Sequence, residues 1–215
     1  MFVGHYAAAL AAKAIEPRAP LWTYVLGAQL VDVGWSGLVM AGIEHASVDP
    51  SLPGSALVLY DMPYTHSLPG AAIWAVGALL LARWVLKLPW GAALAIGLTV
   101  FSHWVLDYLV HRPDLALGFV DQKVGLGLWN YPVPEQALEI GLLAATGAAW
   151  AWTRGKAGLP AWTAPAFLIA LVVVQVVAMM LPMGADPIGM GGSALAVYLA
   201  ITGLAALIDR EKLPT

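Results

Sequence analysis

Residues 101–114 have the sequence FSHWVLDYLVHRPD, and this stretch decides the architecture predicted for the chain. Within it, His103, Asp107 and His111 follow one another at intervals of four residues. On an α-helix each such step advances only about 40° around the axis, so the three side chains share one face. Ionisable side chains inside an apolar helix are costly and indicate a functional site. We therefore expect the rest of the chain to be a scaffold that brings further ligands to this face.

The composition indicates an integral membrane protein. Of the 215 residues, 60% are hydrophobic and 11% are charged, and the mean hydropathy is +0.78. Soluble domains have about 25% charged residues. The formal net charge is -3 and there is no basic run, which argues against a nucleic-acid partner. Because the chain has no cysteine, any metal must be bound by histidine and carboxylate side chains.

The apolar segments predict an all-α fold, a polytopic membrane helix bundle that forms a single domain over residues 1–215. A helix needs about 20 apolar residues to cross a bilayer. Residues 2–15 are too short for this and predict a short N-terminal helix that ends before Pro17. Six full transmembrane helices are predicted at about 20–43, 65–87, 90–111, 132–153, 160–182 and 191–210, with loops at 44–64 and 112–131.

The basic residues indicate how these helices cross the membrane. If the turn at residues 88–89 is cytoplasmic, most lysines and arginines fall on the cytoplasmic side, as the positive-inside rule requires. These are Lys13, Arg18, Arg83, Lys87, Arg154, Lys156, Arg210 and Lys212, against Arg112 and Lys123 outside. The C-terminus is then cytoplasmic. The same orientation brings histidines and carboxylates from several helices together in the outer half of the bilayer.

Five of these residues are candidate metal ligands: His5, Asp32, His66, His103 and Asp107. Imidazole and carboxylate on one helical face, as at His103 and Asp107, form a metal half-site; the alternative is a buried His–Asp hydrogen bond between helices. Asp32 lies at mid-membrane and needs a partner, which a metal, a histidine or protonation would supply. His66 could instead be an interfacial histidine. His5 is a candidate only because a short helix starting at the outer face would place it near the others.

Three further residues are candidates for catalytic roles. Glu139 lies about 10 Å from the start of its span and could be a general base or a ligand. Asp61 could be a ligand, a base or a solvated turn residue. His111 lies at the outer mouth of its helix and suits contact with a substrate, although metal binding and simple solvation stay open. Glu135 and His45 are expected to be solvated.

The motifs in residues 4–107 resemble those of the YdjM-like inner-membrane metal-dependent hydrolases. Gly4-His5 matches the GH of that family, and Asp32 matches the first aspartate of its LPDxDH motif. Residues 65–67 (THS) match its HRGxTHS motif, and His103 and Asp107 match its HxxxD motif. Gly34 and Trp35 replace the second aspartate and the histidine of LPDxDH, and the HRG residues are also absent. This chain therefore either binds one metal or recruits Asp61, His111 or Glu139 for a second.

The resemblance implies a hydrolase of a bacterial or archaeal cytoplasmic membrane. We expect one divalent ion, zinc first, held by Asp32, His66, His103 and Asp107, with His5 completing or flanking this set. A site in the outer half of the bilayer suggests a lipid or lipid-linked substrate, with a phosphoester as the first choice of bond. Two alternatives remain: a transporter for metal ions or small solutes that uses the same residues, and a scaffold in which the metal serves stability alone.

Overall fold

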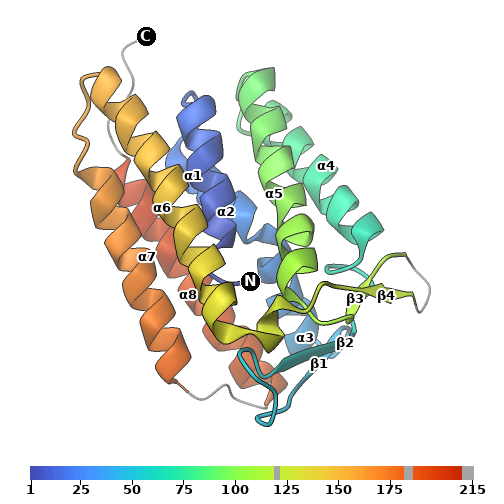
Figure 1. Ribbon diagram of the computed structural model, residues 1–215. Coiled ribbons are helices and arrows are strands. Elements are labelled where there is room, and N and C mark those ends of the chain that lie inside the picture. The colour runs from blue at the N-terminus through green and yellow to red at the C-terminus, as the bar shows by residue number, and fades with distance from the viewer. Residues whose placement is uncertain (119–121, 182–185, 210–215) are drawn as a thin grey trace.

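Two short helices at the start of the chain lie in the middle of the bundle (Figure 1). The computed structural model describes residues 1–118, 122–181 and 186–209. Here α1 (His5–Ile15) packs against α2 (Leu21–Ala28), α5 (Trp90–Val110) and α6 (Pro132–Lys156), and α2 also packs against α8 (Pro187–Ile208). The remaining helices are α3 (Leu30–Met40), α4 (Leu68–Trp84) and α7 (Thr163–Met180). The short N-terminal helix predicted over residues 2–15 is thus present as α1.

The hydrophobic core surrounds α1 and α2. Tyr6 and Leu10 on α1, and Tyr24 on α2, are fully buried, and Trp150 of α6 packs edge-on against Phe167 of α7 in the same core. Because its neighbours cover it on several sides, α1 can end after 11 residues without exposing an apolar face.

The prediction of six full-length membrane helices is wrong. Among the described residues, three helices are long and apolar enough to cross a membrane: α5 with 21 residues, α7 with 18 and α8 with 22. This finding suggests association with a membrane. The predicted span 20–43 is interrupted at Gln29, which separates α2 from α3. The span 65–87 contains a helix of only 17 residues, and α6 is long but carries glutamates near its start and basic residues near its end.

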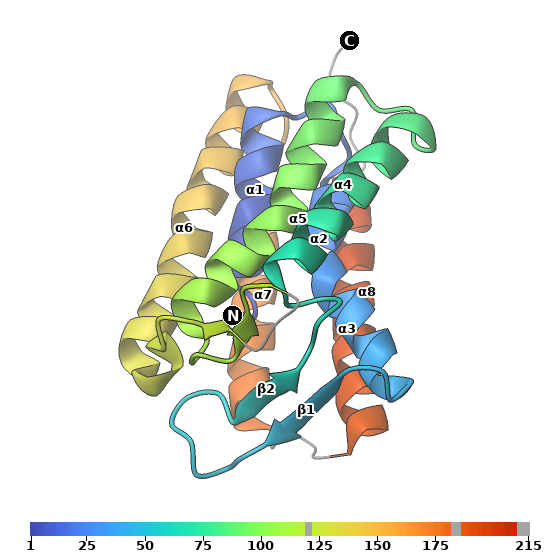
Figure 2. The same ribbon diagram turned by 90° about the vertical axis from the view of Figure 1, so that its right-hand side faces the viewer.

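The expectation of a purely helical fold is also wrong, because both long connections contain paired strands. β1 (His45–Val48) pairs antiparallel with β2 (Leu57–Asp61), and β3 (Leu115–Ala116) pairs with β4 (Lys123–Val124). A 3-10 helix (Leu128–Asn130) then leads into α6. Figure 2 shows β1 and β2 at the end of the bundle where α3 ends. The two hairpins thus pair backbone groups within the predicted loops at 44–64 and 112–131.

Basic residues gather at the opposite end of the bundle, where α1, α4 and α6 end and α5 begins (Figure 1). Asp209 follows α8, and its side chain, which is 4% exposed, accepts hydrogen bonds or ion pairs from three other segments there. Lys13 Nζ lies 2.7 Å, Arg154 Nη1 2.8 Å and the Leu21 backbone nitrogen 2.9 Å from its carboxylate oxygens. This ion cluster therefore connects α1, α2, α6 and the end of α8.

Candidate metal centre

The face of α5 that carries His103 and Asp107 points into the bundle. Each residue is 1% exposed, and His103 Nε2 lies 3.2 Å from Asp107 Oδ2. His111, which follows the last residue of α5, is 3% exposed and its Nε2 atom lies 3.4 Å from Asp107 Oδ1. The spacing of four residues thus places all three side chains together, as the sequence predicts.

Asp32 reaches the same point from α3. Its Oδ1 atom lies 3.2 Å from His66 Nε2 and 3.3 Å from His103 Nε2. The Tyr198 hydroxyl of α8 donates to the other oxygen, Oδ2, over 3.1 Å. The break at Gln29 contributes to this arrangement, because α2 ends at Ala28 and leaves its last carbonyl groups without partners in the helix. The Ala28 carbonyl oxygen lies 2.8 Å from His103 Nδ1.

His66 lies just before α4, and the helix cap fixes its position. The Ser67 hydroxyl accepts a hydrogen bond from the Gly70 backbone N–H at 3.0 Å, as expected of an N-cap residue. Ser67 has an extended backbone at this cap, and His66, which precedes it, is 5% exposed. The indole of Trp104 donates to the His66 carbonyl oxygen over 3.2 Å. His66 Nε2 also lies 3.7 Å from Asp107 Oδ2, which joins it to both carboxylates.

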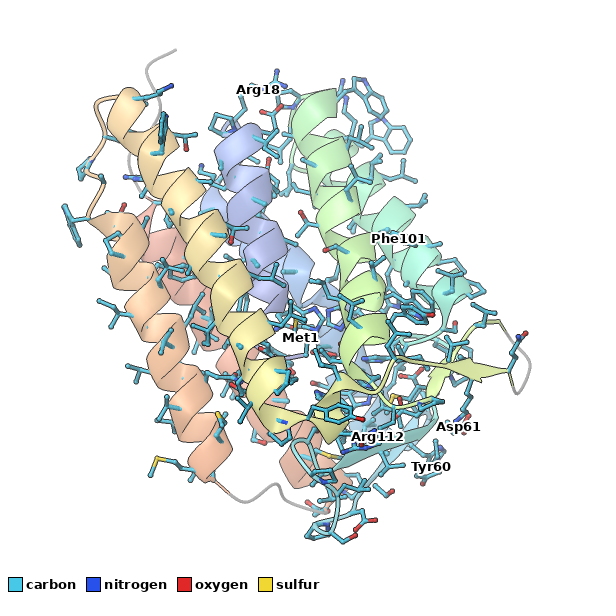
Figure 3. The ribbon with its side chains drawn as sticks, in the orientation of Figure 1. Met1, Arg18, Tyr60, Asp61, Phe101 and Arg112 are labelled. Carbon is cyan, nitrogen blue, oxygen red and sulfur yellow. The ribbon has the colours of Figure 1, made fainter. Side chains whose placement is uncertain are left out.

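His5 is the first residue of α1 and is fully buried. Its ring stacks on the His103 ring, with centroids 3.7 Å apart and planes 4° apart, and its Nε2 atom lies 3.1 Å from Asp107 Oδ1. The α-amino group of Met1 lies 2.8 Å from the same oxygen. Figure 3 shows Met1 between α5 and α6, in the half of the bundle that is nearer to the hairpins.

The geometry of these side chains fits a divalent metal ion. Nε2 of His103 and both ring nitrogens of His5 are buried and have no hydrogen-bond partner, although carboxylate oxygens lie 3.1 to 3.3 Å from the two Nε2 atoms. Two ligands about 2.1 Å from one tetrahedral ion are about 3.4 Å apart. The ligand atoms of His5, His103 and Asp107 all lie within 4.8 Å of one another. The same is true of the ligand atoms of Asp32, His66 and His103.

The outer ring nitrogens are held by further groups, as is usual for metal-binding histidines. His103 Nδ1 faces the Ala28 carbonyl, as described above, and His111 Nδ1 lies 3.1 Å from Asp114 Oδ1. His66 Nδ1 lies 2.8 Å from the Thr65 hydroxyl, which donates to Glu44 Oε2 over 2.5 Å. In each case the Nδ1–H donates outward, so the Nε2 lone pair is directed at the carboxylates.

Glu139 and Asp61 occupy other positions. The Glu139 carboxylate accepts hydrogen bonds from the backbone nitrogens of Phe2 (3.0 Å) and Gly4 (2.8 Å), so it holds the start of α1. Asp61 lies at the end of β2 with a side chain that is 55% exposed, and it pairs with exposed His45 at 3.1 Å. Figure 3 shows Asp61 at the edge of the molecule, apart from Met1. The structure thus brings five candidate ligands and His111 together, but places Asp61 outside this cluster.

Several residues around the cluster were not anticipated. Thr65, Asp114 and Tyr198 each bond to a residue of the cluster, and Glu44 accepts a hydrogen bond from Thr65. Glu135 is 4% exposed although it was expected to be solvated. Thr65 stands beside His66 in the sequence, and Asp114 is three residues after His111, so their spacing was a usable signal. Glu44 and Tyr198 come from distant segments and offered none.

Comparison with protein-family models, with curated proteins and with solved structures found no match for this chain.

Proposed function

We propose that this protein is a metal-dependent hydrolase embedded in a membrane, and that it cleaves an ester bond in a lipid or lipid-linked substrate. One observation carries the proposal: buried imidazole nitrogens of His5 and His103 converge on aspartate oxygens without making hydrogen bonds. Unpaired polar atoms at such depth are expensive. A bound cation would satisfy the nitrogens and both carboxylates at once.

The ligand types favour zinc. Asp32, His66, His103 and Asp107 offer two imidazoles and two carboxylates, a nitrogen and oxygen set that zinc accepts readily. Such an ion supplies hydroxide at neutral pH by lowering the pKa of a bound water from about 15.7 to about 7, and it polarises a phosphoryl or carbonyl oxygen. The role of the chain is to fix the ligands and to surround the centre with apolar helices.

The resemblance to the YdjM-like hydrolases belongs to this proposal. The matching residues His5, Asp32, His66, His103 and Asp107 come from motifs spread over about a hundred residues of sequence, and all of them lie in one cluster. A chance set of weak motif matches would not be expected to converge in this way. The convergence supports a shared metal-binding arrangement.

Apolar helices and exposed aromatic residues support a substrate in the membrane. α5, α7 and α8 are long and apolar enough to cross a bilayer, and large hydrophobic side chains are exposed along them. Tyr60, Tyr64 and Tyr131 are exposed near the hairpins, and tyrosine is enriched where a membrane meets water. A lipid headgroup at that level would be close to the cluster.

The experiment combines metal analysis with a hydrolysis assay on the full chain in detergent. The wild type is expected to retain zinc through dialysis, to release phosphate or alcohol from a panel of phospholipids and lipid phosphates, and to lose this activity with a chelator. The double variant His103→Ala/Asp107→Ala is expected to lose both metal and activity, whereas His45→Ala, which changes an exposed histidine, keeps both. Full metal content in the double variant would disprove the site. Bound metal in a wild type that hydrolyses nothing in the panel would disprove the hydrolase.

A further inference from the structure

The two carboxylate oxygens of Asp107 face different histidines. Oδ2 lies 3.2 Å from His103 Nε2 and 3.7 Å from His66 Nε2, on the side of the cluster that contains Asp32. Oδ1 lies 3.1 Å from His5 Nε2 and 3.4 Å from His111 Nε2, and the α-amino group of Met1 lies 2.8 Å from it. Each oxygen therefore has its own pair of imidazole nitrogens at distances that ligands of one ion would show.

The number of donors is larger than one ion requires. A catalytic zinc site has three protein ligands and an open position, and a structural site has four. This cluster offers six side chains: His5, Asp32, His66, His103, Asp107 and His111. The two candidate groups share His103, but a single imidazole nitrogen binds one ion only. His5 and His111 are thus left over once the first ion has its ligands.

We propose that the cluster binds two divalent ions, with Asp107 as the bridge between them. The first ion has Asp32, His66, His103 and Asp107 Oδ2 as ligands, and the second has His5, His111 and Asp107 Oδ1. This inference rests on the proposed function and narrows its substrate class. Two ions about 3.5 to 4 Å apart stabilise the attacking and the leaving oxygen of a phosphoryl group, which favours a phosphoester as the substrate.

His5 and His111 are both held in the orientation that this second position needs. His111 pairs with Asp114 through Nδ1, and its ring packs on the Trp129 ring with centroids 3.8 Å apart. His5 is held by its stacking on His103 and by Glu139, which binds the start of α1. Both ring nitrogens of His5 are buried without a hydrogen bond. The α-amino group of Met1, 2.8 Å from Oδ1, is the cationic group on this side of Asp107, and the second ion takes its place at that oxygen.

The test counts ions in the full chain, purified in detergent and loaded with either zinc or manganese. For the wild type we expect two ions per chain, and a manganese spectrum by electron paramagnetic resonance that shows magnetic coupling between two neighbouring ions. For the variant His5→Gln/His111→Gln we expect one ion and the spectrum of isolated manganese. His66→Gln is expected to remove the other ion, and His45→Gln, an exposed control, to remove none.

The outcomes separate this inference from the proposed function. One ion per wild-type chain with an uncoupled manganese spectrum would overturn the second position and leave a one-metal hydrolase intact. No bound ion in the wild type would overturn both. The wild-type measurement decides the question even if a variant fails to fold. Loss of phosphoester cleavage in the His5→Gln/His111→Gln variant, with one ion still bound, would further support the two-ion centre.

Discussion

At the scale of single residues, the threonine beside His66 controls which ring nitrogen is available to a metal. The Thr65 hydroxyl has one proton to donate, and Glu44 takes it over 2.5 Å. The same hydroxyl therefore accepts from His66 Nδ1, 2.8 Å away. Backbone nitrogens of Tyr64 and Thr65 also donate to Glu44, at 2.8 and 2.9 Å. This buried carboxylate thus orients the histidine through one hydroxyl group.

Replacing Thr65 by valine is expected to weaken metal binding by roughly 10- to 100-fold, the usual effect of losing an outer partner of a ligating histidine. The shape of the side chain is kept, so the fold is expected to survive. The affinity is measured by competition with a chelator of known strength. Thr65→Ser, which restores the hydroxyl, should bind nearly as the wild type does.

Thr99→Val is the matched control. Thr99 is also buried, but its hydroxyl bonds to the Ala95 carbonyl of its own helix over 2.8 Å. Equal metal affinity for Thr65→Val and the wild type would show that the hydroxyl does not orient His66.

At the scale of helices, close packing of α3 against α8 brings Tyr198 to Asp32. The contact depends on Gly191, where a β-carbon would lie 2.7 Å from the Ser36 carbonyl oxygen and 2.8 Å from Met40 Cγ. Small residues permit such approaches between helices in membranes. At the next residue, Gly192, the nearest atom would be 3.9 Å away, an ordinary contact.

Gly191→Ala is expected to destabilise the protein by about 1 to 3 kcal/mol, because the added methyl group overpacks the contact between α3 and α8. Gly192→Ala introduces the same group one residue later, and it should be neutral or slightly stabilising because alanine favours helices over glycine. Thermal unfolding in detergent measures both. If the two variants unfold at the same temperature, the packing of α8 on α3 is looser than the structure indicates.

The sequence predicted the shared face of α5 because helical spacing is a local property. It did not predict the break at Gln29, since nothing in LGAQLVDVG forbids a continuous helix. The contacts at this break come from elsewhere: the Gln29 amide donates to the Phe2 carbonyl over 3.1 Å, and His103 faces the Ala28 carbonyl. Long-range partners also decide the position of Glu139, whose backbone donors lie more than a hundred residues away in the sequence. Local patterns carry no information about such contacts.

At the scale of the whole molecule, the convergence of the ligands followed from the direction of the helices. Apart from α2 and α3, which continue in the same direction on either side of Gln29, successive helices run in opposite directions, so residues near corresponding ends meet although they are far apart in sequence (Figure 1). This reasoning anticipated the grouping of Asp32, His66 and His103. It overestimated how many helices have the length and hydropathy of a full span, because a break at Gln29 separates α2 from α3, α4 has only 17 residues, and α6 carries charged residues near both ends.

At the end of the bundle away from the hairpins, Asp209 connects α1, α2 and α6 to the end of α8. The substitution Asp209→Asn is expected to lower the free energy of unfolding by about 3 to 5 kcal/mol. The substitution removes a buried negative charge that lies 2.7 Å from Lys13 and 2.8 Å from Arg154. Such a change removes a close opposite charge from two buried cationic side chains, which is strongly destabilising. Asp61→Asn removes an exposed ion pair with His45 and should have a much smaller effect. The temperatures of unfolding compare the two, and similar values would contradict a structural role for Asp209.

Because the candidate metal centre is deeply buried, how fast a metal ion exchanges and how tightly it binds are two different properties. Its six candidate ligands range from fully buried His5 to Asp32 at 8% exposed. Release of an ion held among them would be slow, because a chelator reaches its ligands only when a surrounding segment opens, so competition with a chelator has to run until exchange is complete. Until exchange is complete, competition between metals is decided while the chain folds. The ion found in the purified protein would record which metals were present at that moment, and not which of them binds most tightly.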